Sequence, residues 1–590
     1  IHNYFFYLMY DKNILVSIEG IQIDLFEYID KNSGFLKNQY LDIIFKLSSF
    51  ILEDQYLKNQ LNFKGHSLWE MSLLQEKNIF KNKSIFKTIK YLALKKIISE
   101  NKNKKIKIFF LERDLASYLK EEFENIDLYF FDKSFSLIEN FIQKRNKSLL
   151  FHFLFFLYFF LKNCSFRKFN YKKFIKKKIL VFSYFTHYDE KKFSKKIFYP
   201  KQWSNLWEKI NENTNFLQIF IPNKKFKFFF QVENLVTKNS FKDLKKENFI
   251  NHFIFYKYYL SVFKDFRSIS PKKLFLKIEK KLKYNKNFKY FFEINKEAFI
   301  SSFTGYTLLQ NILWINIFDN LFKNIPKHDY GVFAFENQPW EKAFITSWKK
   351  YDQGKLIGYT HTTINFWHLN YFNIKDYNCL EEFNKFSPDL IAVSSEISKN
   401  FLINQSINSK KIVEVEALRY QWILNKKNTL KNIDDKNKRI LFLGDYKIDI
   451  NNQLIKILNQ SKDELKSLGF QISYKPHPST IVKNIDDEIH LTNEDLEQLI
   501  DTHRYIVSSN STSAIIEALS CGLNTFLFID KNNFDLSPIK NTKIEKKANF
   551  FCTKEELLYK LDNYQKNCDP IEYYYLNEEL IKWKKILEIR

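Results

Sequence analysis

Cysteine, methionine, glycine and proline are scarce in this sequence. Its 590 residues include 5 Cys, 2 Met, 10 Gly and 10 Pro, whereas average usage of Gly and Pro is about 7% and 5%. The cysteines occur singly and form no CxxC pair, which indicates neither a zinc site nor a disulfide scaffold. Such usage is typical of a reducing cytoplasm. The five positions are Cys164, Cys379, Cys521, Cys552 and Cys568.

The sequence also lacks an apolar run long enough to span a bilayer, for which about 20 residues are needed. The most apolar run, LLFHFLFFLYFFL, covers only residues 149–161. Two interpretations stay open, a buried helix that joins domains or a segment in a membrane interface, and the basic residues on both sides favour anionic lipid. Because the chain begins at Ile1 without an initiator Met, a fragment is an open alternative, and the lack of a signal peptide excludes little.

Acidic residues are fewer than basic ones. There are 93 Lys and Arg against 67 Asp and Glu, which gives a formal charge of +26 and favours anionic partners. Since the lysines are spread through the chain and no motif that reads DNA or RNA is present, we expect no nucleic-acid partner and favour an anionic membrane surface. With 45% hydrophobic and 27% charged residues, the composition is globular, and the length allows roughly two to four domains.

Strands and helices alternate between Gln471 and Asp530. This alternation implies parallel strands covered by helices, and ligands of such sheets lie outside the carboxyl ends of the strands. Two polar clusters fall at these ends, KPHP at 475–478 and SSNSTS at 508–513. The predicted elements are strands at 470–474 and 505–507 and helices at 493–502 and 514–519.

The second cluster leads directly into a helix, so its amides and hydroxyls predict a phosphate cradle, with an ordinary Ser/Thr helix cap as the alternative. Lys475 and His477 would add cationic and hydrogen-bonding groups from a neighbouring strand end. Glu517 would accept hydrogen bonds from a ribose diol, and Gly444 would form a tight turn at the cleft. The predicted nucleotide-binding residues are Lys475, His477, Ser509, Ser511, Thr512, Ser513, Glu517 and Gly444.

Three strands further upstream deliver polar residues to one sheet edge. They are predicted at 331–335, 356–359 and 390–393, and the polar edge is expected to face a cleft. Glu336 and His361 follow the first two strands and are the candidates for a general base that deprotonates an acceptor hydroxyl. The alternatives are a helix-cap carboxylate and a histidine satisfied at a strand end. Glu341 lies further into the helix and is predicted to be a solvated or structural charge.

Several of these stretches resemble known families. KPHP followed by SSNSTSAIIEALSCG resembles the nucleotide-binding half of GT-B glycosyltransferases, especially bacterial capsule, sialic-acid and Kdo transferases. The stretches SLWEMSLLQEK (67–77), YFTHYDEKKFSKKIFYPKQWSNLW (184–207), ENQPWEKAF (336–344) and GYTHTTINFW (358–367) resemble surface carbohydrate biosynthesis proteins. The resemblance implies an α/β protein of the GT-B class, with two Rossmann-like domains facing a cleft and an additional N-terminal α/β domain.

The domain organisation follows from these assignments. No catalytic constellation is evident before residue 140; the charged residues 112–114 are interpreted as an ordinary helix start. Residues 68–94 are predicted to be mainly helical, and helices are predicted at 554–566 and 571–589. The predicted parts are an N-terminal α/β domain (1–140), an apolar and basic linker (141–177), a first Rossmann-like acceptor domain (178–425), a second Rossmann-like nucleotide-sugar domain (426–545) and C-terminal helices (546–590).

The function implied is transfer of a sugar from a nucleotide sugar to a surface polysaccharide or lipid-linked glycan, in the cytoplasm or at the inner face of its membrane. No metal and no cofactor are expected, because Lys475, His477 and the serine cluster would stabilise the leaving nucleotide. The acidic runs 486–488 and 434–435 are interpreted as solvated. A retaining reaction with a carboxylate nucleophile stays open. The alternative functions are a sugar-nucleotide 2-epimerase and a non-catalytic nucleotide-binding scaffold.

Overall fold

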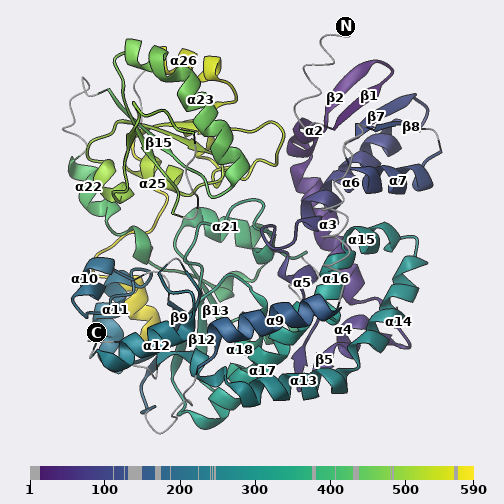
Figure 1. Cartoon of the computed structure of the whole chain (residues 1–590), viewed down its shortest axis with the longest axis vertical. Helices are drawn as coiled ribbons and strands as arrows, with labels where there is room; N and C mark the ends of the chain where they lie inside the picture. Colours follow the sequence, from purple (N-terminus) through teal and green to yellow (C-terminus); the bar gives the residue numbers. More distant parts are fainter. Residues whose placement is uncertain are drawn as a thin grey trace.

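The computed structural model describes most of the chain, and Figure 1 shows a purple N-terminal region beside two larger α/β units. The predicted fold class is confirmed: the chain is an α/β protein with two parallel six-stranded sheets, as in the GT-B fold, and an extra N-terminal α/β region. The described residues are 14–110, 112–124, 126–130, 149–165, 174–185, 188–223, 225–239, 241, 244, 248–374, 381–405, 407–429, 438–478, 480, 484–563 and 569–589.

The N-terminal region contains a mixed sheet in the order β2-β1-β7-β8. β1 is antiparallel to β2 and β7, whereas β7 and β8 are parallel. The strands are β1 (Leu15–Ile18), β2 (Ile21–Asp24), β7 (Ile106–Phe110) and β8 (Ile126–Phe130), and the main helices are α2 (Leu25–Lys31), α3 (Ser33–Ser48), α6 (Ser84–Glu100) and α7 (Arg113–Glu122). The hairpins β3 (Ile51–Leu52), β4 (Gln55–Tyr56) and β5 (Asn62–Phe63), β6 (His66–Ser67) flank α4 (Leu57–Gln60) and precede α5 (Leu73–Glu76).

The first large sheet has the order β10-β9-β11-β12-β13-β14, and all its pairings are parallel. Helices cover both faces, so its strands are nearly continuous apolar runs. The strands are β9 (Ile179–Phe185), β10 (Thr214–Phe220), β11 (Tyr330–Ala334), β12 (Lys355–Tyr359), β13 (Leu390–Val393) and β14 (Ile412–Glu414). Helices of this unit are α10 (Glu190–Ser194), α11 (Ser204–Ile210), α12 (Phe229–Lys238), α18 (Pro339–Lys350), α20 (Glu381–Phe386) and α21 (Glu396–Asn404). The next helix, α22 (Ile423–Thr429), packs in the core of the second large unit.

A helical layer joins this sheet to the N-terminal region. One apolar core runs from Val16 in β1 through the layer to Phe344 in α18 and Trp367 beyond β12. The N-terminal region therefore does not have a core of its own. The layer consists of α9 (Leu149–Asn163), α13 (Tyr256–Ile269), α14 (Pro271–Lys283), α15 (Lys289–Ile294), α16 (Lys296–Phe303) and α17 (Tyr306–Asn324). None of the helices within the described ranges is long and apolar enough to cross a bilayer.

The second large sheet has the order β17-β16-β15-β18-β19-β20 and is parallel throughout. Its strands are β15 (Arg439–Leu443), β16 (Gln471–Lys475), β17 (His490–Leu491), β18 (Tyr505–Ser509), β19 (Asn524–Phe528) and β20 (Asn549–Phe551). Its helices are α23 (Ile448–Ser467), α24 (Leu496–Leu499), α25 (Ala514–Ser520) and α26 (Lys554–Asp562). The predicted helix at 493–502 is thus shorter, and the segment expected to hold only C-terminal helices supplies the edge strand β20.

The C-terminal segment returns to the first unit. The helix predicted at 571–589 is wrong over its first half, because only α27 (Ile581–Leu587) is helical. The carboxylate of Glu416 accepts hydrogen bonds from the first N–H groups of α27, at 2.8 Å from Lys582 and 3.1 Å from Trp583. The Trp583 ring is fully buried and lies 5.1 Å from that of Tyr359. Upstream, the stretch 68–94 is mainly helical, as predicted, and divides into α5 and the start of α6 at Ser84.

Candidate functional site

Glu336 and His361 lie together at the carboxyl edge of the first large sheet. They follow β11 and β12, which pair in parallel, so the two strand ends meet at one edge. His361 Nε2 is 3.6 Å from Glu336 Oε1, and the side chains are 10% and 29% exposed. This spacing allows an imidazole and a carboxylate to act on the same substrate hydroxyl.

Burial lowers the pKa of His361, while Glu336 raises it and Arg419 lowers it further. Burial is the largest of these effects, so the imidazole is neutral near pH 7 and has a free lone pair to accept a proton. Within the described residues, His361 Nδ1 is buried and has no hydrogen-bond partner. The ring is therefore oriented by packing and by Glu336.

The backbone around Glu336 is held by Glu341. This carboxylate is fully buried and accepts the N–H of Glu336 at 3.0 Å and that of Asn337 at 2.8 Å. Glu341 is thus structural and not solvated. Asn337 has φ +59°, a left-handed conformation that asparagine tolerates, and its amide donates to Asn370 O at 2.6 Å. The side chain of Gln338 donates a hydrogen bond to Glu336 Oε2.

The N-terminal region contributes to this edge, although no catalytic constellation was expected there. Lys81 Nζ lies 2.6 Å from Glu76 Oε1 and donates to Gln338 Oε1 at 3.3 Å. Glu76 is 1% exposed; burial raises its pKa, Lys81 lowers it, and Glu336 raises it. The only sequence signal was that Glu76 falls inside the stretch SLWEMSLLQEK.

In the second large sheet, two hydroxyls of the serine cluster form hydrogen bonds with Asp445. This residue follows β15, which lies between β16 and β18, and it is 1% exposed. The hydroxyls of Ser509 and Ser511 both donate to Asp445 Oδ2, and the N–H of Lys447 donates to Oδ1 at 2.6 Å. Two hydroxyls predicted to face a phosphate are therefore engaged by a carboxylate of the protein.

Gly444 is required for close packing. Its φ is not in the left-handed region. A Cβ at this position would lie 2.6 Å from the hydroxyl of Tyr474 and 3.0 Å from the N atom of His477. The absence of a side chain therefore lets the loop after β16 approach the end of β15.

Lys475 and His477 follow β16 beside this loop. Lys475 Nζ donates to the carbonyl of Glu494, and burial lowers the pKa of Lys475. Burial also lowers the pKa of His477, which Asp445 raises and Lys475 lowers. Both side chains are half-buried, so the structure brings His477 to the serine cluster and directs Lys475 toward β17 and the loop after it.

Thr512, Ser513 and Glu517 lie at the start of α25. Thr512 Oγ1 accepts the N–H of Ala514 at 3.3 Å, which is the ordinary turn expected of the capping alternative. Ser513 is the N-cap and makes no side-chain capping bond. Burial raises the pKa of Glu517 to about 7, and Arg419 opposes this increase.

Arg419 was not identified from the sequence, and its charge acts on one titratable residue in each of the two large units. It follows β14, is exposed, and its charge lowers the pKa values of both His361 and Glu517. Across the described part of the chain, its guanidinium has no hydrogen-bond or ion-pair partner. Its five N–H donors therefore have no protein acceptor among the described residues.

Aromatic contacts join the N-terminal region to the loops after β12 and β15 of the two large units. Phe80 packs edge-on against His368 at 6.1 Å and against Tyr446 at 5.6 Å. The amide of Asn365 donates to Leu536 O at 3.2 Å. The loop after β12 therefore contacts the second unit directly, and the two sheet edges are not separated by an open gap along their whole length.

No three His, Cys, Asp or Glu side chains gather as a metal-binding group within the described ranges. The acidic run 486–488 is paired with lysines: Lys462 lies 2.8 Å from Asp486 and 3.0 Å from Glu488. The run at 434–435 lies outside the described residues.

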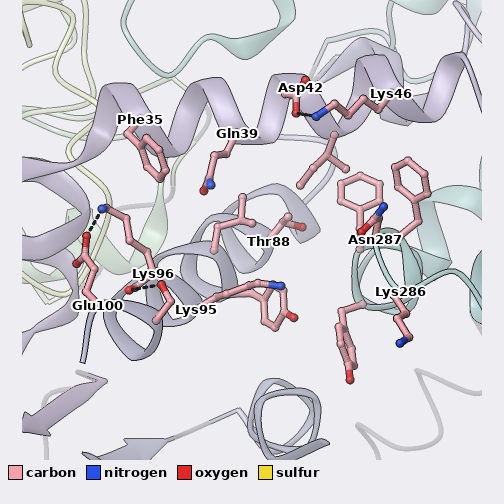
Figure 2. A pocket seen from close by; sticks show the side chains of 17 residues that line it. Phe35, Gln39, Asp42, Lys46, Thr88, Lys95, Lys96, Glu100, Lys286 and Asn287 are labelled. Atoms are coloured by element: carbon pink, nitrogen blue, oxygen red, sulfur yellow. Dashed lines mark hydrogen bonds and ion pairs between the residues drawn. The ribbon is translucent and has the colours of Figure 1, made fainter. Parts of the chain in front are cut away.

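A separate hollow of about 550 Å³ lies on the N-terminal region between α3, α6 and the start of α15 (Figure 2). Its charges are largely paired, since Lys46 lies 2.6 Å from Asp42 and Lys96 pairs with Glu100. None of the predicted site residues lines this α3–α6 hollow.

No protein-family model matches the sequence, and no curated protein matches it. Among solved structures, the chain is similar to UDP-GlcNAc 2-epimerase from Neisseria meningitidis bound to UDP-GlcNAc, at 14% identity over 70% of this chain and 99% of that one, with a TM-score of 0.39. The 2-epimerase from Methanocaldococcus jannaschii has the same identity and coverage and a TM-score of 0.38. MurG from Acinetobacter baumannii is 10% identical over 65% of this chain and 90% of its own, with a TM-score of 0.31.

Proposed function

We propose that this protein is a glycosyltransferase that moves a sugar from a nucleotide sugar to a surface polysaccharide or lipid-linked glycan, at the inner face of the cytoplasmic membrane. The observation that carries the proposal is the position of Arg419. Its unpaired guanidinium acts electrostatically on His361 of the first unit and on Glu517 of the second. The positive charge of Arg419 therefore acts both on a residue suited to the acceptor hydroxyl and on a residue suited to the donor nucleotide, and it would attract an anionic donor.

On the donor side, Arg419 binds the diphosphate or monophosphate of the donor. A guanidinium offers paired N–H groups that match phosphate oxygens. Thr512 and Ser513 add hydroxyls, and Glu517 accepts hydrogen bonds from the ribose diol. Because Asp445 already engages Ser509 and Ser511, these two serines position the loop, and the phosphate lies toward Arg419, away from the Asp445 carboxylate.

On the acceptor side, Glu336 or His361 removes the proton of the attacking hydroxyl. The acceptor oxygen then bonds to the anomeric carbon, the bond from that carbon to the phosphate oxygen breaks, and the nucleotide leaves with the bonding electrons. Arg419 stabilises the negative charge that develops on the leaving phosphate. In a retaining reaction, Glu336 would instead attack the anomeric carbon first, and the anomeric configuration of the product, measured by NMR, distinguishes the two routes.

The test begins with a thermal-shift panel of UDP-, GDP-, CMP- and dTDP-sugars. A true donor at about 100 times its Kd stabilises the protein by about 3 kcal/mol. The stabilising sugar nucleotide is then incubated with the protein and glycan acceptors. Sugar transferred to an acceptor supports the proposal. Release of the free epimerised sugar nucleotide without an acceptor identifies a 2-epimerase instead, and binding without turnover identifies a scaffold.

A further inference from the structure

A second hollow, of about 690 Å³, lies where α13 meets α14. We name it the α13–α14 hollow. Its apolar lining includes Phe266, Pro271 and Leu276, and Leu276 is 54% exposed. Half of its ten lining residues are cationic and none is acidic: Arg267, Lys272, Lys273, Lys277 and Lys280. An apolar floor ringed by charge of one sign is chemically distinct from the predicted nucleotide site.

The positive charge of this hollow is largely uncompensated. Lys277 pairs with Glu53 at 2.6 Å, whereas the other four cations have no ion pair with any described residue. In the α3–α6 hollow in Figure 2, by contrast, three of the four lining lysines are paired: Lys46 with Asp42, Lys96 with Glu100 and Lys95 with Glu122. Among the described residues, the α13–α14 hollow therefore leaves four of its five cations free for an anionic ligand.

An exposed helix face continues from the hollow along α13. Tyr256, Leu260, Lys264 and Arg267 follow at spacings of three or four residues, which places them on one face of the helix. Tyr256 is 64% exposed and Leu260 is 62% exposed. Since Arg267 also lines the hollow, this face and the hollow form one continuous surface.

α9 contacts α13 and also exposes apolar side chains. The two helices are packed through aromatic rings, Phe153 on Phe263 at 5.4 Å and Phe156 on Tyr259 at 5.9 Å. The outer face of α9 exposes apolar side chains at every turn and contains no acidic residue. They are Leu150, Leu154, Phe155, Tyr158 and Leu161, each at least 45% exposed.

We propose that α9, the outer face of α13 and the α13–α14 hollow form a docking surface for an anionic lipid bilayer, in which the hollow holds one anionic lipid. The acyl chain contacts Phe266, Pro271 and Leu276, and Lys272, Lys273 and Lys280 bind the phosphate. Exposed apolar side chains beside lysines are the chemistry of interfacial helices. A second copy of this face would bring like charges together, and a nucleic acid would make no use of the exposed leucines.

The inference deepens the proposed function, on which it rests for the lipid-linked acceptor, but the binding itself requires no sugar transfer. It can therefore be measured without a donor, by co-sedimentation with vesicles of phosphatidylcholine and of phosphatidylcholine mixed with phosphatidylglycerol. We expect binding to the mixed vesicles that weakens as salt is raised. Equal binding to both vesicle types, or to neither, overturns the inference and leaves the proposed function standing.

Charge reversal tests the hollow itself. The triple variant Lys272→Glu, Lys273→Glu, Lys280→Glu is expected to bind mixed vesicles about 100-fold more weakly, at roughly tenfold or less for each charge. The matched control is Lys191→Glu, Lys195→Glu, Lys456→Glu, with the same change in net charge at exposed lysines outside this surface. If both triples lose affinity equally, binding reflects overall charge and the inference fails.

A variant of the apolar face completes the experiment. Leu154→Ser with Leu161→Ser removes two exposed side chains, so the fold is expected to stay intact. We expect at least a tenfold loss of vesicle affinity together with an unchanged thermal shift by the donor nucleotide sugar. Full vesicle binding by this variant contradicts insertion of α9 into the bilayer, whereas the absence of any thermal shift in the wild type would count against the proposed function alone.

Discussion

The Nε2 atom of His361 lies 3.6 Å from the Oε1 atom of Glu336, although the two residues come from different strand ends. The parallel pairing of β11 and β12 fixes this approach. The pair is asymmetric: burial lowers the pKa of His361, whereas Glu336 keeps 29% of its side chain exposed. A neutral imidazole next to an accessible carboxylate suits proton removal from a substrate hydroxyl.

The first prediction separates Glu336 from Glu341. Glu336→Gln is expected to lower kcat by about 10²–10⁴-fold, as loss of a general base does, and to change the free energy of unfolding by less than about 0.5 kcal/mol. Glu341→Ala leaves the N–H groups of Glu336 and Asn337 without an acceptor and is expected to destabilise the fold by about 1–3 kcal/mol. Urea unfolding and transfer assays measure both. Full activity of Glu336→Gln would remove it from the mechanism.

The second prediction concerns Arg419. Arg419→Ala is expected to weaken nucleotide-sugar binding by about 10–100-fold, since a hydrogen bond to a charged group is worth about 1.5–3 kcal/mol. Arg419→Lys keeps the charge and loses the planar fork, so it should recover only part of the affinity. Calorimetric titration with the donor measures the affinity of the wild type and of the two variants. Equal affinity in all three would show that the phosphate lies elsewhere.

The sheets could be predicted from the sequence because buried parallel strands read as short apolar runs, as Gly331 to Phe335 and Leu390 to Val393 do. The same logic placed Glu336 beside His361. The C-terminal segment could not be predicted, because packing overrides its helical pattern. Tyr574 stacks on Tyr420 at 4.1 Å, and the backbone of Tyr575 bonds to those of Ala417 and Ser394, which keeps this stretch extended.

The site was less predictable than the fold, because side-chain partners are set by residues far apart in the chain. The hydrogen bond from Ser509 to Asp445 could be predicted only from the strand order, in which β15 lies between β16 and β18. Arg419 belongs to no recognised motif, and the proposal for it depends on its electrostatic effect on residues of both units. Lys81 and Gln338 are 257 positions apart in the chain, and the periodicity of the sequence cannot predict a contact between residues so far apart.

The third prediction tests the coupling of Lys81 to Glu76. Lys81→Met leaves the buried carboxylate of Glu76 without its partner at 2.6 Å, so the fold is expected to lose stability. The double variant with Glu76→Gln should restore about 1–2 kcal/mol of the loss. Because Lys81 also contacts Gln338, which holds Glu336, activity should stay low even where stability returns. Strictly additive stability changes would show that the pair is not coupled.

The fourth prediction is a pH dependence of stability. Burial lowers the pKa of His368 from 6.5 to about 4, so between these values the unfolded chain binds more protons than the folded one. The stabilisation is complete above pH 6.5 and is lost as the pH falls toward 4, by up to about 1.4 kcal/mol per pH unit. Urea unfolding should show that the free energy of unfolding decreases between pH 7 and pH 5 in both proteins. The decrease is expected to be roughly 2 kcal/mol smaller in His368→Gln than in the wild type. An equal drop in both proteins would contradict the depressed pKa.

The fifth prediction uses two glycines as a matched pair. In Gly444→Ala the new Cβ would lie 2.6 Å from the Tyr474 hydroxyl and 3.0 Å from the N atom of His477, so overpacking is expected to cost about 1–3 kcal/mol. Gly34, within α3, has nothing within 4 Å of such a Cβ, and Gly34→Ala should be neutral or stabilising.

Affinity gives the sharper distinction between these two variants. Because the loop carrying His477 must move away from β15 to admit the methyl group, Gly444→Ala should also bind the donor more weakly, whereas Gly34→Ala should bind it as the wild type does. If Gly444→Ala loses stability and keeps its full affinity, the loop after β16 does not contact the nucleotide. The donor contacts would then belong to Arg419 and the start of α25 alone.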